Sequence, residues 1–267
     1  TGQPLTGHNS TVYAVACTQL DGHPTAITGA RDGTIRLWNL TTGQPTGQPL
    51  TGHNGPVYAV ACTQLDGHPT AITGSWDGTI RLWNLTTGQP TGQPLTGHNY
   101  WVTAVACTQL DGHPTAITGS WDGTIRLWNL TTGQPTGQPL TGHNSTVHAV
   151  ACTQLDGHPT AITGARDGTI RLWNLTTREP TGQPLTGHNG WVNALACTQL
   201  DGHPTAITGA TDGTVILWNL LSKKVVSRLL LPASCEAVAV SPTGTLVCAF
   251  GNDIAVLRRD HNGSSAV

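Results

Sequence analysis

The feature that most constrains this chain is an internal repeat with a period of 45 residues. Five copies begin at Thr1, Thr46, Thr91, Thr136 and Thr181, and most of their positions are identical. A period of about 20 to 50 residues is typical of solenoids, propellers and other arrays. Because a unit of this size cannot bury its faces alone, the copies must stack on one another.

Each copy carries the pattern of a small antiparallel sheet. In the first copy, three β-rich runs occupy residues 11–19 (TVYAVACTQ), 25–30 (TAITGA) and 34–40 (TIRLWNL). Asp21-Gly22 and Asp32-Gly33 separate them, and Asp-Gly between apolar runs indicates a hairpin because both residues tolerate positive φ. A fourth run, GQPLTG, contains Pro49 in the second copy. Proline cannot donate to a ladder, so this run predicts an outer edge strand and the unit is a four-stranded meander.

The consensus of the copies, LTGHN…V..VACTQLDG…AITGxxDGTIRLWNL, resembles the WD-repeat β-propeller family. It contains the Gly-His pair, the hairpin, the Asp-Gly-Thr turn and the Trp that ends the third strand. The match extends over all five copies, with one departure: Trp38-Asn39 and its equivalents replace the usual Trp-Asp. The resemblance implies an all-β fold in which each copy contributes one blade.

The resemblance also implies a hydrogen-bonded tetrad of His, Thr, Asp and Trp in each blade. A buried carboxylate needs donors, and a buried imidazole or indole N–H needs acceptors. A Thr–His–Asp set could indicate nucleophilic catalysis, but five identical copies favour a structural role, so we expect no enzyme activity. The five tetrads are His8, Thr28, Asp32, Trp38; His53, Thr73, Asp77, Trp83; His98, Thr118, Asp122, Trp128; His143, Thr163, Asp167, Trp173; and His188, Thr208, Asp212, Trp218.

The residues after Val225 break the consensus but still predict strands. CEAVAVSPTGTLVCAFG keeps the first two strands and their turn, and DIAVLRR can be the third. The Gly-His pair and the Trp are missing, so this blade has lost its tetrad, and it lacks a fourth strand. Residues 2–7 repeat the outer-strand run without strands before them, so they can supply it, while the fifth blade uses VVSRLLL.

We therefore predict one domain, residues 1–267, that is an all-β, six-bladed β-propeller of four-stranded antiparallel blades, closed by pairing the N-terminal strand with the last blade. The blades are expected near 8–51, 53–96, 98–141, 143–186, 188–231, and 235–259 plus 2–7. A seven-bladed ring in the parent protein is the alternative. The chain starts at Thr1 and contains no Met, so we expect a segment of a longer protein or an engineered chain.

Composition excludes several classes of partner. The net charge is −2 and the 12 Lys and Arg are dispersed, which argues against nucleic acid. No run of eighteen apolar residues could span a membrane. Five of the 7 Cys occupy the same position in the five copies, after VA or LA. A single Cys per copy indicates a small buried hydrophobe rather than a disulfide or metal site. We expect no metal, no cofactor and a reducing, cytoplasmic location.

The copies differ at few positions, and these point to function. Across the first four copies, five variable columns are those of residues 10, 11, 13, 30 and 31; two more change only in the fourth copy, to Arg178 and Glu179. Three columns precede or open the first strand, and two lie in the turn before the tetrad Asp. In a propeller these loops emerge on one face, so all five columns are expected around one mouth of the central channel.

Nearly every aromatic residue outside the tetrads lies in these columns. Tyr, Trp and Arg dominate binding hot spots, and exposing them usually means a partner. In the family resembled here, these columns are recurrent partner contacts. The expected partner-binding residues are Thr11, Tyr13, Arg31, Tyr58, Trp76, Tyr100, Trp101, Trp121, His148, Arg166, Trp191, Asn193 and Glu236.

The favoured function is a non-enzymatic module, a monomeric ring that binds a protein or peptide at this mouth. Near-identical copies resemble the repeat arrays of bacterial multidomain signalling and defence proteins, where such propellers are C-terminal sensor domains. Two alternatives remain. A carbohydrate-binding propeller would stack sugars on Trp and Tyr, although repeated sugar sites should be alike. A structural or engineered scaffold would be near-symmetric, although it should not leave the aromatic residues unevenly placed.

Overall fold

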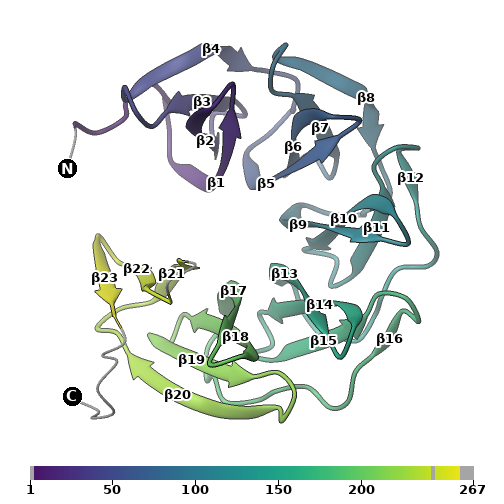
Figure 1. Ribbon diagram of the computed structural model, residues 1–267, viewed down its shortest axis with the longest axis vertical. Helices are drawn as coiled ribbons and strands as arrows, with labels where there is room; N and C mark the ends of the chain where they lie inside the picture. Colours follow the sequence, from purple (N-terminus) through teal and green to yellow (C-terminus); the bar gives the residue numbers. More distant parts are fainter. Residues whose placement is uncertain (1–2, 242–243, 259–267) are drawn as a thin grey trace. The chain divides into compact units, whose positions relative to one another are not determined.

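The computed structural model describes residues 3–241 and 244–258 of the chain. It divides the chain into two compact units, Thr1–Val150 and Ala151–Val267. The described residues form β-strands, turns and loops without a helix, and therefore no helix that could cross a membrane. The predicted all-β fold with six successive antiparallel blades is confirmed (Figure 1).

The first unit contains three four-stranded blades in which neighbouring strands follow chain order. It also contains the start of β13. Blade 1 is β1 (Val12–Leu20), β2 (His23–Ala30), β3 (Ile35–Asn39) and β4 (Gln44–Leu50); blade 2 is β5 (Val57–Leu65), β6 (His68–Ser75), β7 (Ile80–Asn84) and β8 (Gln89–Leu95); blade 3 is β9 (Val102–Leu110), β10 (His113–Ser120), β11 (Ile125–Asn129) and β12 (Gln134–Pro135).

The second unit contains the rest of blade 4 and blades 5 and 6. Blade 4 is β13 (Val147–Leu155), β14 (His158–Ala165), β15 (Ile170–Asn174) and β16 (Glu179–Pro180); blade 5 is β17 (Val192–Leu200), β18 (His203–Ala210), β19 (Thr214–Asn219) and β20 (Lys224–Leu230); blade 6 is β21 (Cys235–Val240), β22 (Leu246–Phe250) and β23 (Asp253–Leu257). As predicted, the run VVSRLLL supplies the outer strand of blade 5, because β20 pairs with β19.

The turns follow from their Asp-Gly pairs. Asp21 and Gly22 have φ of 50° and 76°, and the equivalent pair in each of the other four copies is also left-handed. Two positive φ angles in a two-residue loop match the twist of a β-hairpin. The second pair behaves differently, since only Gly33 has positive φ there (77°). Asp32 keeps a negative φ, and its carboxylate points into the blade, where it contacts His8.

The outer strand starts earlier than expected and is irregular. In blades 1 and 2 it begins at Gln44 and Gln89, ahead of the GQPLTG run, and the register shifts within it. In blades 3 and 4 it shrinks to two residues, with a separate bridge farther along, Ile125↔Leu140 and Ile170↔Leu185. Proline removes one ladder donor from each of these runs, so their pairing is discontinuous.

Adjacent blades within a unit are joined by apolar cores that contain the tetrad Trp of the later blade. Between blades 1 and 2, Trp83 packs with Ile27 and Leu37. Trp128 takes the same place between blades 2 and 3, and Trp218 between blades 4 and 5. These indoles are 0–3% exposed. Blades 2, 3 and 5 therefore each close the apolar face of the blade before them.

The blade-to-blade contact is closest at a glycine in the second strand. A Cβ built on Gly74 would lie 2.5 Å from Val102 Cγ1 of the next blade. The glycine at the equivalent position of blade 1, Gly29, has the same relation to Val57. Val57 and Val102 are fully buried, whereas Val12, which has no preceding blade in its unit, is 47% exposed.

Blade 6 differs from the prediction. It has three strands in the part of the chain that the structure describes. Residues 3–7 lie in no strand, so they do not form the predicted N-terminal outer strand; residues 1–2 and 259 lie outside the described residues. Leu5 instead lies 3.7 Å from a Cβ built on Gly43, much as Leu50 lies 3.5 Å from one on Gly88. The segment packs beside blade 1 as an outer strand packs beside the next blade, but without a ladder.

We expect Gly74→Ala to lower the free energy of unfolding by about 1–3 kcal/mol, the usual cost of overpacking a tight core. The added methyl would meet Val102. Urea denaturation measures the change. In a Val102→Ala background, which itself loses packing, the additional cost of Gly74→Ala should shrink. An equal cost in both backgrounds would contradict the steric explanation.

Candidate functional site

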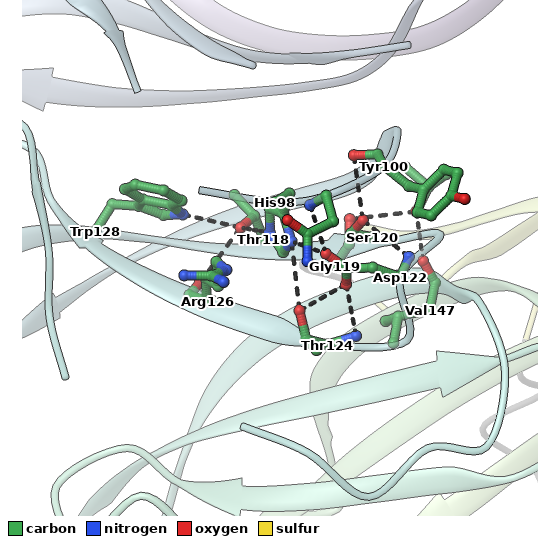
Figure 2. Close-up of polar contacts among 12 residues, drawn as sticks. His98, Tyr100, Thr118, Gly119, Ser120, Asp122, Thr124, Arg126, Trp128 and Val147 are labelled. Atoms are coloured by element: carbon green, nitrogen blue, oxygen red, sulfur yellow. Dashed lines mark hydrogen bonds and ion pairs between the residues drawn. The ribbon is translucent and has the colours of Figure 1, made fainter. Parts of the chain in front are cut away.

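A hydrogen-bonded network connects the turn before β11 to the interior of blade 3 (Figure 2). His98 Nδ1 lies 3.0 Å from Asp122 Oδ2, and its Nε2 lies 2.7 Å from Thr118 Oγ1. The indole N–H of Trp128 donates to the same hydroxyl at 2.9 Å. All these groups are satisfied when Nδ1 donates its proton to Asp122 and Nε2 accepts from Thr118.

The tetrads of blades 1 and 2 show the same contacts, and that of blade 5 shows one variation. In blades 1 and 2, His8 and His53 lie 3.1 and 2.9 Å from Asp32 and Asp77 and 2.8 Å from Thr28 and Thr73, while Trp38 and Trp83 donate to those hydroxyls. In blade 5, Trp218 donates to Thr208 and His188 Nε2 contacts Thr208, but His188 Nδ1 lies 2.6 Å from Thr214 Oγ1 and 3.9 Å from Asp212. In blade 4, Trp173 donates to Thr163.

The structure adds a fifth member to this network, the Thr of the Asp-Gly-Thr turn. Thr79 donates its hydroxyl and its backbone N–H to Asp77 Oδ1, at 2.7 and 2.9 Å. The backbone N–H of Asn54 donates to the other carboxylate oxygen at 2.9 Å. The equivalents of Thr79 are Thr34, Thr124, Thr169 and Thr214. The sequence signal was present, since this Thr follows Asp-Gly in every copy.

These hydrogen bonds hold the carboxylates in the charged state. Burial raises the pKa of Asp32, but hydrogen bonds from Thr34, Asn9 and His8 outweigh it and lower the pKa to about 2. The pKa values of Asp77 and Asp122 are also lowered, for the same balance of reasons. Thr73 and Thr118 are fully buried. A substrate would have no access to these hydroxyls, which is physical ground for a structural role.

Backbone hydrogen bonds join the two variable loops of a blade to each other. The backbone N–H of Trp76 donates to the carbonyl of Pro56 at 2.9 Å, and that of Trp121 to the carbonyl of Trp101 at 2.9 Å. Arg31 makes the same bond to Thr11. These bonds place columns 11 and 31 side by side in blades 1 to 3. They lie at the ends of the first two strands that are far from the hairpin between those strands. In blade 2, for example, Val57 pairs with Ser75 at this end, and the Asp66-Gly67 hairpin joins β5 to β6 at the other.

One of the five variable columns is buried in all five copies. Column 30 contains Ser75 and Ser120, which are fully buried, and so are the alanines at its other positions. The expectation that all five columns project from the surface is therefore wrong for this one. Ser75 Oγ donates to the carbonyl of Gly55 and accepts from the N–H of Asp77, so it supports the turn from inside.

Six of the predicted residues form one continuous cluster in the first unit, here called the aromatic surface: Tyr13, Tyr58, Trp76, Tyr100, Trp101 and Trp121. Trp101 lies at its centre. The ring centroids of Trp101 are 4.7 Å from Trp121 in a stacked arrangement, 4.9 Å from Trp76 edge to face, and 6.0 Å from Tyr58. Tyr13 adjoins Tyr58 at 4.8 Å and Tyr100 adjoins Trp121 at 6.4 Å. Trp76 is 47% exposed and Tyr100 57%.

A cation lies at one end of the aromatic surface. Burial raises the pKa of Tyr58, the charge of Tyr13 raises it further, and the positive charge of Arg31 opposes both. Arg31 is exposed, and its charge acts on the Tyr58 end of the cluster. The predicted residues Thr11 and His148 also belong to this unit; Thr11 is exposed and His148 is half-buried on β13.

The predicted residues of the second unit form two pairs. The guanidinium carbon of Arg166 lies 4.0 Å from the ring centroid of Trp191, a cation–π contact. Asn193 Nδ2 donates to Glu236 Oε2 at 3.5 Å. Both pairs join adjacent blades, 4 with 5 and 5 with 6.

The cysteines are free thiols. Burial raises the pKa of Cys62 and Cys107 to about 12, so both are protonated at neutral pH. Cys17 was expected to be buried but is exposed, because β1 has no preceding blade in its unit. Within residues 3–241 and 244–258, no group of three His, Cys, Asp or Glu residues could hold a metal ion.

Comparison with known families gives one result. A family model described as "WD domain, G-beta repeat" matches residues 2–39, 43–84, 88–129, 133–174 and 179–219, which is more than half of the chain. A search of curated proteins finds no match. The five matched segments contain the five tetrads, and blade 6 lies outside them.

The environment of His188 predicts a pH dependence of stability. Burial lowers its pKa, Asp212 opposes this, Arg228 adds to it, and the result is about 4 against 6.5 for the unfolded chain. Between pH 6.5 and pH 4, His188 is therefore protonated in the unfolded chain but not in the folded chain. The free energy of unfolding falls as pH drops through this range. At about 1.4 kcal/mol per pKa unit, the loss is about 3 kcal/mol.

Urea denaturation between pH 7 and pH 4.5 measures this slope. His188→Gln should flatten it, whereas His203→Gln, at an exposed hairpin position, should leave it unchanged. The interpretation is wrong if His188→Gln retains the full slope.

Proposed function

The chain belongs to the WD-repeat family, whose propellers typically act as scaffolds for protein interactions, and on this basis we propose that it is a non-enzymatic recognition module. Its partner is a protein or peptide, which docks on the aromatic surface of the first unit. The partner-binding residues there are Tyr13, Arg31, Tyr58, Trp76, Tyr100, Trp101 and Trp121, with Thr11 and His148 beside them. Arg166, Trp191, Asn193 and Glu236 are the proposed partner-binding residues of the second unit.

The observation that carries this proposal is the continuity of the exposed rings. Trp76, Tyr100 and Trp121 are 39–57% exposed although they are among the largest apolar side chains of the protein. Exposing an apolar patch of this kind to water is unfavourable, and a bound partner that covers the patch removes it from water. Trp and Tyr are the residue types that contribute most to the centres of protein interfaces.

The rings are also held in place before any partner arrives. Trp101 contacts Tyr58, Trp76 and Trp121, and the backbone bonds from Trp76 to Pro56 and from Trp121 to Trp101 fix the loops. Ordering a side chain on binding costs about 0.5–1.5 kcal/mol. A surface whose rings already support one another avoids much of that cost.

The charge at the edge of the surface favours one kind of partner. Arg31 is the charged group next to the rings, while the neighbouring carboxylates of Asp77 and Asp122 are occupied by hydrogen bonds inside the blades. A guanidinium pairs well with carboxylates and carbonyl groups. The proposed ligand is therefore a peptide segment with apolar or aromatic anchors and an acidic group or free carbonyl at one end.

The ring contacts argue against the carbohydrate alternative. A sugar stacks on an open ring face, but Trp101 has Trp121 stacked on it and Tyr58 beside it, and Trp76 meets it edge to face. A peptide can bury ring edges as well as faces. The proposal extends to a sensor domain of a bacterial multidomain protein in the cytoplasm, which rests on the near identity of the copies and on the free thiols.

The test compares the native protein with a variant that combines Trp76→Ala, Trp101→Ala and Trp121→Ala. Proteins retained from cell lysate are identified by mass spectrometry, and the affinity of each purified partner is then measured by calorimetry. Loss of one interface anchor costs at least about 2 kcal/mol, so we expect affinity to fall at least about 30-fold.

A control variant combines His68→Ala and His113→Ala, which are exposed at the opposite strand ends of the same blades. It should bind every partner as the native protein does. A partner that binds the triple variant with unchanged affinity would show that the aromatic surface is not its site, and unchanged affinity for all partners would refute the proposal.

A further inference from the structure

Blade 6 lacks the residues that fill the gap between the other blades. The pair Leu246↔Leu257 in β22 and β23 is equivalent to Ala206↔Trp218 in blade 5. Leu257 therefore occupies the position of the tetrad Trp. By the same register, Val238↔Cys248 is equivalent to Leu195↔Thr208, so Cys248 replaces the tetrad Thr.

The neighbouring gap shows what a Trp does at this position. Between blades 4 and 5, Trp218 packs with Leu155, Ile162 and Leu172 of blade 4, and is 3% exposed. The equivalent face of blade 5 consists of Leu200, Ile207 and Leu217. It meets Leu257, a side chain that lacks the fused rings of an indole.

A cavity of about 360 Å³ lies between blades 5 and 6, beside Leu257. Leu200, Ile207 and Leu217 line it from blade 5, and Leu246 and Leu257 line it from blade 6. Leu200 is only half-buried here, whereas Leu155, its equivalent in blade 4, is 6% exposed. Polar side chains border the cavity, among them His203, Ser227 and Arg258.

The grooves between blades 1 and 2 and between blades 2 and 3, of about 440 Å³ each, are not smaller but have a different lining. In the groove between blades 1 and 2, Trp83 forms part of the wall, and Trp128 does so between blades 2 and 3. Leu37 and Leu82, the equivalents of Leu217, are buried in the cores that contain those indoles, whereas Leu217 is only half-buried. Those grooves are lined mainly by the Thr, Gln, Gly and Pro residues of the outer strands.

We propose that the cavity between blades 5 and 6 is a binding site for an aromatic ring of about the size of an indole. The repeat itself supplies the template, because the same apolar face holds a Trp side chain in the neighbouring gap. The volume falls in the range of about 300–1,000 Å³ that is common for ligand pockets, and an apolar lining with a polar border is typical of them. The ring comes either from a free small aromatic molecule or from a Trp or Phe side chain of a peptide.

This site is separate from the aromatic surface and does not depend on the proposed function. It uses residues of β17 to β20 and β21 to β23, whereas the aromatic surface uses the loops of blades 1 to 3. Binding at the cavity and binding at the aromatic surface can therefore be tested independently.

The probes are indole and N-acetyl-tryptophanamide, and their binding is measured by calorimetry. The native protein should bind indole, and Leu257→Trp, which fills the cavity from within, should lose that binding by at least tenfold and raise the thermal unfolding midpoint. Val256→Trp is the matched control: Val256 precedes Leu257 in β23 and is 56% exposed, so the added ring stays outside and binding should be unchanged. The triple Trp→Ala variant of the aromatic surface should also bind indole normally.

Binding of both probes identifies a peptide side chain as the fitting ligand, and binding of indole alone identifies a free small molecule. Absence of binding by both probes overturns the proposal, and so does unchanged binding by Leu257→Trp. If Leu257→Trp fails to fold, Leu257→Phe reduces the cavity by a smaller ring and should weaken indole binding; unchanged binding by this folded variant overturns the proposal as well.

Discussion

The fold depends on the tryptophan that ends the third strand of each repeat. Its ring packs on the face of the preceding blade, as Trp83 does against Ile27 and Leu37. Its N–H donates to the Thr73 hydroxyl inside its own blade. A single side chain therefore closes the gap between two blades and completes the polar network of one. Burying an indole without a partner for its N–H would be costly, which is why the ring and the Thr hydroxyl occur together.

The same network separates what must stay constant from what can vary. Asp77 accepts hydrogen bonds from the N–H groups of Asn54 and Thr79, so one carboxylate fixes both the loop that enters the first strand and the turn before the third. The backbone of these loops is then independent of the side chains they carry. Trp76 adjoins Asp77 in sequence, yet Arg31 occupies its place in blade 1 with the same backbone bond. A repeat of this kind can change its surface without changing its fold.

Blade 6 shows the consequence of losing the network. Leu257 and Cys248 replace the Trp and the Thr, and the histidine position is taken by Leu231, whose carbonyl approaches Gly213 as that of His53 approaches Gly33. The polar set has been exchanged for apolar side chains as a group, which avoids leaving one buried partner unsatisfied. The exchange does not preserve side-chain volume, and an apolar-lined cavity lies beside Leu257.

The repeat period, the strands, the Asp21-Gly22 turns and the columns that carry the exposed rings were determined by the sequence alone. These features arise from local chemistry that recurs at a fixed spacing. The sequence did not reveal that Ser75 faces inward, that Cys17 is exposed, that residues 3–7 form no ladder, or that Trp101 contacts three other rings. Each of these depends on which atoms of a neighbouring blade or loop lie opposite a residue. Only the packing of one blade against the next decides that, because identical strands acquire different surroundings from their position in the array.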